Sequence, residues 1–249
     1  MKSKLIVSAV QLKVLSVKRN LFKILKYIQK ASGINSDIIC FPECSFNPNY
    51  KKASLEKDLA PIQKACKKAN IFVIINGYFR GKNKNIYNRT YLIDNKGKIL
   101  GFYDKIHLWV NELNNVRRGR LVKVINTHLG RIGLCTCWDL FFPNMFAELR
   151  NKGAEIIFCL AYWKDEFNKK DAKFLEYAPT VIAYQHMCFC VFCNASSRGA
   201  TAISQIAAPW DGLKKMRYEE GMITAKLYYQ RLKRFKDHFK IVFFERNLN

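Results

Sequence analysis

The stretch RIGLCTCWDLFFPNMFAELRNKGAEIIFCLAYW, from Arg131 to Trp163, contains two strand-length apolar runs separated by a helix-like segment. The first run ends at Cys135, and residues 154–163 form the second. Between them, Pro143 stands at a position that proline favours in the first turn of a helix, and Gly153 follows as a helix terminator. Two buried strands around a helix predict an α/β fold.

The same alternation of strand and helix patterns begins at the N-terminus. Apolar runs predict strands at residues 4–10, 37–41 and 71–77, and helical periodicity separates them at residues 17–32 and 55–69. Residues 87–103 have the pattern of a hairpin around the turn DNKGK, so the predicted sheet is mixed and not purely parallel.

The C-terminal part continues without a break. It predicts a helix at residues 178–186, a strand at 187–195, and a pair of strands at 201–208 and 222–228 joined through the sequence PWDG at 209–212. No linker, low-complexity tract or repeat of fixed period interrupts the chain. We therefore predict a single domain over residues 1–249.

Composition favours a soluble protein of a reducing compartment. Hydrophobic residues make up 49% of the 249 residues, yet the longest apolar runs are far shorter than the roughly 18 residues of a membrane span. Residues 1–13 lack a small-residue cleavage site and are interpreted as a first strand, not a signal peptide. Nine cysteines, mostly inside apolar runs, form an odd number without a secretory signal, so we expect the cytoplasm.

The balance of charge is strongly basic. Lys and Arg number 43 against 19 Asp and Glu, a formal net charge of +24 that would suit nucleic acid or an anionic membrane. The basic residues are scattered, however, and the one compact cluster is RLKRFKDHFK at residues 231–240. No nucleic-acid-binding motif accompanies them, so we expect neither a nucleic-acid partner nor a membrane partner.

Three reactive side chains stand at or just beyond the ends of predicted strands: Glu43, Lys105 and Cys137. Sites in open α/β sheets assemble at such ends. A thiol can attack a carbonyl, a carboxylate can take the thiol proton, and an ammonium can stabilise the resulting oxyanion. The three residues together therefore suggest acyl transfer, whereas any one of them alone would carry no meaning.

A zinc site is the main alternative for the cysteines, through CTC at 135–137 or CFCVFC at 188–193. Structural zinc usually takes paired cysteines with two-residue spacers. Cys190 and Cys193 have that spacer but no matching pair nearby, so no metal site is predicted.

Three motifs resemble those of the carbon–nitrogen hydrolase (nitrilase) superfamily. They are FPE at 41–43, YDKIHL at 103–108, and CWDLFFP at 137–143 followed by GAEII at 153–157. The similarity extends from Gln11, through Asn88 and Asn194, to PWDG at 209–212. The motifs occur in the family's order and in matching strand contexts, which makes the resemblance specific.

The resemblance implies a four-layer α-β-β-α sandwich with mixed sheets, usually paired into a dimer, so we expect a homodimer or a higher homo-oligomer. It implies that Glu43 is the general base, Lys105 the oxyanion-stabilising lysine and Cys137 the nucleophile, and it requires no metal or organic cofactor. Glu112 matches a second family glutamate, because ELNNVRRG keeps the seven-residue step from Glu to Gly. This glutamate often positions the substrate amine or the base.

Other residues around the motifs receive supporting roles. By the resemblance, the backbone N–H of Trp138 is the second oxyanion donor, and we predict that Trp163 contacts the substrate. His107 supports the lysine loop and is not the base, and Asp139 braces the turn after Cys137. Cys135 is interpreted as core packing.

The predicted activity is hydrolysis of a non-peptide carbon–nitrogen bond in a linear amide or an N-carbamoyl (ureido) compound. A cysteine thioester forms and ammonia or an amine leaves. CWD at 137–139 resembles carbamoylases more than the CWE pattern of nitrilases. A nitrile hydrolase, an acyltransferase, and a non-catalytic member binding an acidic partner through its basic surface remain alternatives. The loops at 47–53, 111–118 and 162–171 carry no readable code for the substrate.

Overall fold

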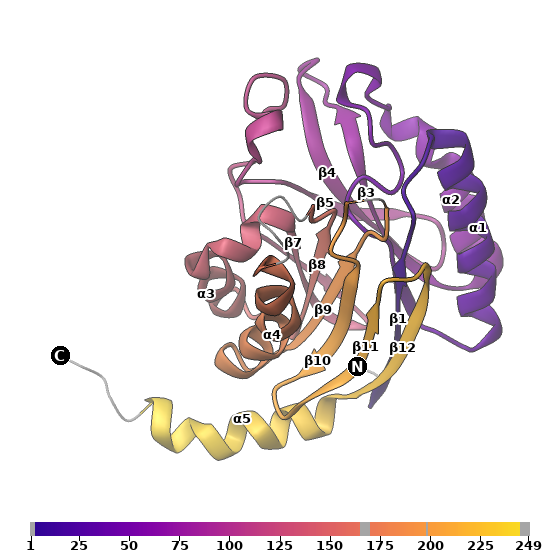
Figure 1. Ribbon diagram of the computed structural model, residues 1–249. Helices are drawn as coiled ribbons and strands as arrows, with labels where there is room; N and C mark the ends of the chain where they lie inside the picture. Colours follow the sequence, from indigo (N-terminus) through magenta and orange to yellow (C-terminus); the bar gives the residue numbers. More distant parts are fainter. Residues whose placement is uncertain (1–2, 165–169, 198, 245–249) are drawn as a thin grey trace.

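The computed structural model describes residues 3–164, 170–197 and 199–244. In this part of the chain, two six-stranded sheets pack face to face (Figure 1). The first sheet has the order β12 (Gly221–Tyr228), β1 (Lys4–Gln11), β2 (Ile38–Cys40), β3 (Phe72–Arg80), β4 (Ile86–Ile93) and β5 (Ile99–Asp104). The second has the order β11 (Asp211–Arg217), β10 (Ile203–Ala208), β9 (Phe189–Asn194), β8 (Ile156–Ala161), β7 (Gly130–Thr136) and β6 (Lys123–Thr127).

Both sheets are mixed and share one plan. Strands β1, β2 and β3 run parallel, as do β7, β8 and β9, and the remaining neighbours are antiparallel. The predicted hairpin at 87–103 is confirmed as β4 and β5. The prediction of a mixed sheet is confirmed, since each sheet contains both parallel and antiparallel pairs.

Helices cover the outer face of each sheet (Figure 1). Helices α1 (Val17–Gly33) and α2 (Ala60–Ala69) lie on the first sheet, and α3 (Pro143–Asn151) and α4 (Lys170–Gln185) lie on the second. Short 3₁₀ helices occupy the connections: η1 (Tyr50–Lys52), η2 (Glu56–Leu59), η3 (Val110–Glu112) and η4 (Cys137–Phe141). The result is the four-layer α-β-β-α arrangement that the sequence resemblance implied.

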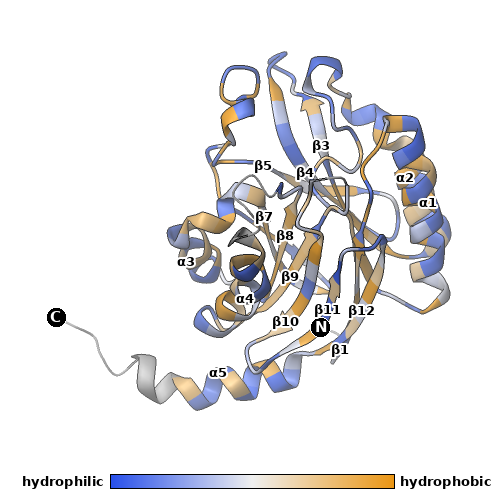
Figure 2. Ribbon diagram, in the orientation of Figure 1, coloured by the Kyte–Doolittle hydropathy of each residue, from blue (hydrophilic) through white to orange (hydrophobic). Residues whose placement is uncertain are grey.

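Alternation along the strands produces the layers. In β2, Ile38 and Cys40 face the core between the sheets, while Ile39 faces the core beneath α1 and α2. In β3, Ile74 likewise faces the core between the sheets, and Val73 faces the core beneath the helices. A strand with apolar residues on both faces must be covered on both sides, which requires a second sheet and an outer helix layer. Figure 2 shows apolar residues gathered on the strands and polar residues along the outer helices.

The predicted pairing near the C-terminus is wrong. Strand β10 pairs with β11 through a tight turn at Pro209 and Trp210, whereas β12 pairs along its whole length with β1 in the other sheet. Strand β11 reads DGLKKMR and is mostly exposed, so it lacked the apolar signal of a strand. The basic cluster at 231–240 belongs to helix α5 (Tyr229–Phe244), which extends from the body of the molecule (Figure 1).

Within the described residues, none of the helices combines the length and the hydropathy needed to cross a membrane.

Candidate active site

Glu43 lies three residues beyond β2 and points into a buried polar cluster. Its Oε1 accepts hydrogen bonds from Lys105 Nζ at 2.8 Å and Asn88 Nδ2 at 2.7 Å, and its Oε2 accepts one from the Tyr162 N–H at 2.9 Å. The turn continues into Cys44, which has a φ of 61° and donates its N–H to Asn76 Oδ1. The carboxylate is therefore fixed by donors from three separate segments.

Lys105 follows β5 directly and is 2% exposed. Its Nζ donates at 2.8 Å to Glu43 Oε1 and at 2.8 Å to Glu112 Oε2. Burial favours the neutral amine, but the neighbouring Glu43, Cys137 and Glu112 raise the pKa of Lys105 well above its usual value. The side chain stays an ammonium, with one N–H beyond its two ion pairs.

Glu112 closes the cluster from η3. Its Oε1 accepts from Tyr78 Oη at 3.0 Å and Asn88 Nδ2 at 2.7 Å, and its Oε2 also accepts from the Trp109 N–H at 2.9 Å. Burial opposes ionisation, yet Lys105 and these donors lower the pKa of Glu112 below its ordinary value. The structure thus brings the fourth predicted residue into the same cluster as Glu43 and Lys105.

The structure explains why a glycine, Gly119, follows Glu112 by seven residues. Its N–H donates to the Lys105 carbonyl oxygen at 2.8 Å, and a Cβ placed on it would lie 2.0 Å from the Asp104 carbonyl oxygen. The loop that carries Glu112 returns to the end of β5 at a point where no side chain fits.

Cys137 begins η4 immediately after β7 and has a φ of 50°. That left-handed conformation is unusual for a residue with a side chain and occurs at functional sites. Burial raises the pKa of the Cys137 thiol well above its usual value, and the Glu43 carboxylate raises it further, while Lys105 opposes the shift. The resting side chain is a neutral thiol beside a carboxylate.

Asp139 holds the turn of Cys137 against the loop of Lys105. Its Oδ2 accepts from the Thr136 N–H at 2.8 Å and from Tyr103 Oη at 2.6 Å. Its Oδ1 accepts from the His107 N–H at 3.0 Å and lies 2.7 Å from His107 Nδ1. His107 therefore contacts the brace and not the thiol, as predicted, and Asp139 has the expected structural position.

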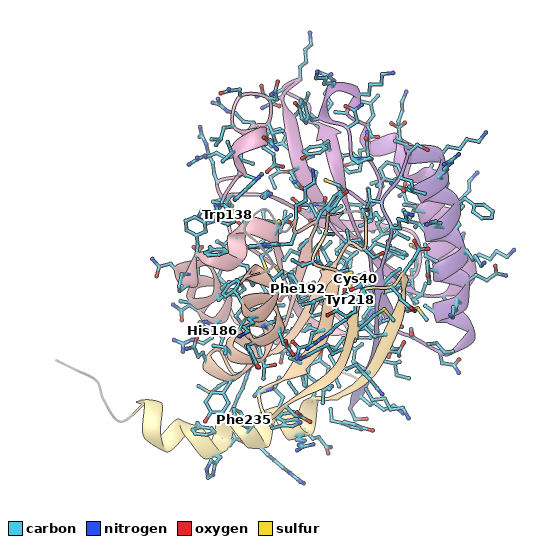
Figure 3. The ribbon with its side chains drawn as sticks, viewed as in Figure 1. Cys40, Trp138, His186, Phe192, Tyr218 and Phe235 are labelled. Carbon is cyan, nitrogen blue, oxygen red and sulfur yellow. The ribbon has the colours of Figure 1, made fainter. Side chains whose placement is uncertain are left out.

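These side chains surround a cavity of about 230 Å³. Its lining includes Glu43, Cys44, Pro48, Tyr78, Lys105, Trp109, Asn111, Glu112, Cys137, Trp138, Phe141, Tyr162, Trp163 and Lys164. Trp138, labelled in Figure 3, follows the thiol as the second residue of η4, and the first N–H groups of a helix have no partner within the helix. Trp163 lies two residues beyond β8, so all six predicted site residues border one space.

Sequence reasoning gave no role to the polar side chains behind the charged cluster. Asn88 donates to both Glu43 and Glu112, and its Oδ1 accepts from Asn76 Nδ2 at 2.8 Å. Asn76 interrupts the apolar strand IFVIING, and a buried amide in such a strand needs partners. A polar residue inside this apolar strand indicated a buried hydrogen-bond network, but the sequence did not show which residues Asn76 contacts.

Of the other cysteines, Cys44 also lines the cavity, directly after Glu43. Cys135 is fully buried in the core between the layers, which confirms its interpretation as packing. Among the residues that the structure describes, no group of three or more His, Cys, Asp or Glu side chains is arranged to hold a metal ion. Residues 165–169, within the predicted specificity loop at 162–171, lie outside the described residues.

Curated relatives include two amidases. The chain is 27% identical over 164 residues to deaminated glutathione amidase from Dictyostelium discoideum, covering 55% of this chain and 56% of that protein. It is 24% identical over 230 residues to 2-oxoglutaramate amidase from Bacillus subtilis (strain 168), covering 85% of each. The chain thus spans little more than half the length of the first relative.

A solved structure and a family model extend the comparison. The crystal structure of Nit3 from Saccharomyces cerevisiae, a member of branch 10 of the nitrilase superfamily, has a TM-score of 0.90. It covers 99% of this chain and 98% of its own chain at 18% identity, which shows a shared fold. The sequence model for carbon-nitrogen hydrolases matches residues 6–234, and the chain therefore belongs to the carbon-nitrogen hydrolase family.

Proposed function

We propose that this protein is a cysteine amidase that hydrolyses the carbon–nitrogen bond of a small linear amide or N-carbamoyl compound. The observation that carries the proposal is the shared cavity of a thiol, a carboxylate and a lysine ammonium, with Lys105 Nζ 2.8 Å from Glu43 Oε1. The amidase names of the curated relatives support the same class of reaction.

The first half-reaction forms a thioester. Cys137 Sγ attacks the substrate carbonyl carbon while its proton passes to Glu43, because a thiol with a raised pKa needs a base at the moment of attack. Lys105 Nζ and the Trp138 N–H stabilise the oxyanion. Glu43 then gives the proton to the leaving nitrogen, which departs as ammonia or an amine as the carbon–nitrogen bond breaks.

The second half-reaction restores the enzyme. Glu43 takes a proton from water, the resulting hydroxide attacks the thioester carbonyl, and the same two donors hold the second oxyanion. The carbon–sulfur bond breaks, the acid leaves, and the proton on Glu43 returns to Cys137. Every bond change is thereby balanced by residues of this chain and one water molecule.

Glu112 acts as a positioning residue in this scheme. It shares the Lys105 ammonium with Glu43 and is linked to Glu43 through Asn88. With a carboxylate on each side, the ammonium keeps its charge and its direction throughout the cycle. The geometry supports this role over direct proton transfer, because Glu112 Oε1 and Oε2 are occupied by the donors of Tyr78, Asn88, Lys105 and Trp109.

The proposal is tested by ammonia release from a panel of primary amides, N-carbamoyl amines and nitriles, with intact-mass detection of a trapped acyl adduct. Cys137→Ala removes activity and adduct, and Glu43→Gln lowers kcat by about 10²–10⁴-fold. Cys66→Ala, a cysteine change in α2, is the matched control and retains activity. Ammonia release that persists in Cys137→Ala contradicts the thiol mechanism, and turnover of nitriles alone reassigns the protein to nitrile hydrolysis.

We also propose a cytoplasmic location. All nine cysteines are free and buried, which suits a compartment that keeps thiols reduced.

A further inference from the structure

We propose that the substrate of this site is an uncharged amide that carries a flat, unsaturated ring close to the reacting carbonyl. This inference rests on the proposed amidase function and names the class of amide that the cavity selects. The observation behind it is a continuous set of aromatic rings that begins beside the nucleophile and ends at the mouth of the cavity.

The rings contact one another in sequence. Trp109 meets Trp138 edge-on with ring centroids 4.5 Å apart, and Trp138 lies 4.4 Å from Phe141. Phe141 is stacked with Trp163 at 5.5 Å and an interplanar angle of 19°. These four side chains, which we call the ring wall, all line the cavity. Because Trp138 directly follows Cys137, a group attached to the reacting carbonyl meets the ring wall first.

The ring wall is not explained by core packing alone. Phe141 lines the cavity, yet its side chain remains 44% exposed. Aromatic side chains that remain exposed beside a cavity mark a binding surface for apolar groups. Their flat faces favour a stacked or edge-on ring over a flexible aliphatic chain.

The charges of the lining disfavour an anionic substrate. Among the residues that the structure describes, the lining contains two cations, and Lys105 is already paired with two buried carboxylates. Lys164 is exposed at the mouth and lies over the Tyr162 ring, 5.7 Å from its centroid. A substrate carboxylate would thus meet one solvated ammonium outside and two carboxylates within, a setting of low affinity. This contrasts with the carboxylate-bearing substrate in the name of 2-oxoglutaramate amidase.

The size of the cavity fits the proposal. A cavity of about 150 Å³ accommodates benzene. The cavity here is about 230 Å³, which leaves room for an amide group and a short link beside one ring.

The experiment compares kcat/KM for four primary amides: 3-phenylpropanamide, 3-cyclohexylpropanamide, butyramide and succinamate. We expect 3-phenylpropanamide to exceed butyramide by at least about tenfold, with the cyclohexyl compound between them and succinamate lowest. In Phe141→Ala the phenyl-to-butyramide ratio falls by about tenfold. Phe22→Ala, which removes another exposed phenylalanine on α1, is the matched control and keeps the ratio.

Two outcomes overturn the inference while leaving the amidase function intact. Either butyramide matches the phenyl compound, or succinamate is preferred and loses its preference in Lys164→Ala. If neither these amides nor the amides and N-carbamoyl amines of the first panel are hydrolysed, the amidase function fails, and ligand binding to Cys137→Ala by calorimetry then decides the inference. Tighter binding of 3-phenylpropanamide than of butyramide supports the ring wall, and equal binding rejects it.

Discussion

Cys137 combines a left-handed backbone with a raised thiol pKa, and the two features have one cause. The residue is the first of η4 and follows a largely buried strand, so the chain must turn sharply while the thiol stays in the cavity. The turn places Sγ beside the Glu43 carboxylate in a buried setting, which disfavours the thiolate. Under the proposed mechanism, the Cys137 thiol is therefore activated during the reaction and not in the resting protein.

Alkylation of Cys137 by iodoacetamide should rise with pH through about pH 9 and show no plateau near neutrality, because the raised pKa keeps the thiol protonated there. Glu43→Gln removes the carboxylate charge that raises the thiol pKa, so the midpoint of Cys137 alkylation shifts to lower pH while kcat for amide hydrolysis falls by about 10²–10⁴-fold. Mass spectrometry of the Cys137 peptide after timed alkylation gives both profiles. A wild-type plateau near pH 7, or an unchanged midpoint in the variant, rejects this explanation.

At the same scale, the sequence predicted the charged site residues better than their partners. Glu43, Lys105 and Cys137 stand in short motifs at strand ends, so local sequence identifies them. The bonds of Asn88 join residues 45 and 24 positions away along the chain. Such contacts are set by the register of β3 and β4 and by the path of the loop after β5, neither of which local sequence contains.

At the scale of elements, the loop from β5 to η3 and its return at Gly119 determine where Lys105 and Glu112 meet. The N–H of Gly119 donates to the Lys105 carbonyl oxygen, and its Cα faces the end of β5 without space for a side chain. The position of the Lys105 ammonium thus depends on a glycine that does not line the cavity.

Gly119→Ala should lower kcat/KM by about 100-fold, because the added Cβ would lie 2.0 Å from the Asp104 carbonyl oxygen and must displace the loop. Gly33→Ala is the matched control, since a Cβ there meets nothing within 4 Å and activity is retained. Steady-state kinetics with urea denaturation of both variants separates displacement of the site from general loss of stability. Unchanged kcat/KM in Gly119→Ala contradicts the role of this contact.

The sequence predicted the strands that are continuous apolar runs, but it did not predict the strands or pairings that depend on a neighbouring strand. The strands at 4–10, 71–77 and 154–163 are fully or largely buried, so hydrophobicity alone reveals them. Strand β11 is stabilised by pairing with β10 and carries lysines on its exposed surface. Strand β12 joins β1 across more than 200 residues, a pairing that no local pattern encodes.

At the scale of the whole molecule, α4 presents an apolar face that this chain leaves exposed. Phe174, Tyr177, Val181 and Tyr184 recur at steps of three and four residues and are all exposed. Tyr184 packs on Phe235 of α5, labelled in Figure 3, which extends the apolar surface toward the basic helix. We propose that a second copy of the chain covers this face, as the family resemblance implies.

Sedimentation analysis should therefore show a homodimer, and Tyr177→Asp combined with Val181→Asp should weaken it by at least about tenfold in Kd. The net charge of +24 makes the two copies repel, so the dimer should strengthen as salt screens that repulsion. Phe22→Asp on α1 is the control and leaves the dimer unchanged. A monomeric wild type at high salt, or a dimer that survives both substitutions on α4, argues against this interface.

Because the site is divided between the two sheets, it forms late in folding and is lost early in unfolding. Glu43, Lys105 and Glu112 follow strands of the first sheet, whereas Cys137, Trp138 and Trp163 follow strands of the second. Neither half carries the whole proposed catalytic set, so the proposed mechanism requires both halves to be docked before turnover begins. Under that mechanism, activity is lost when the two sheets separate, even while the helices and strands are still intact. A ligand that contacts residues of both sheets stabilises the docked state.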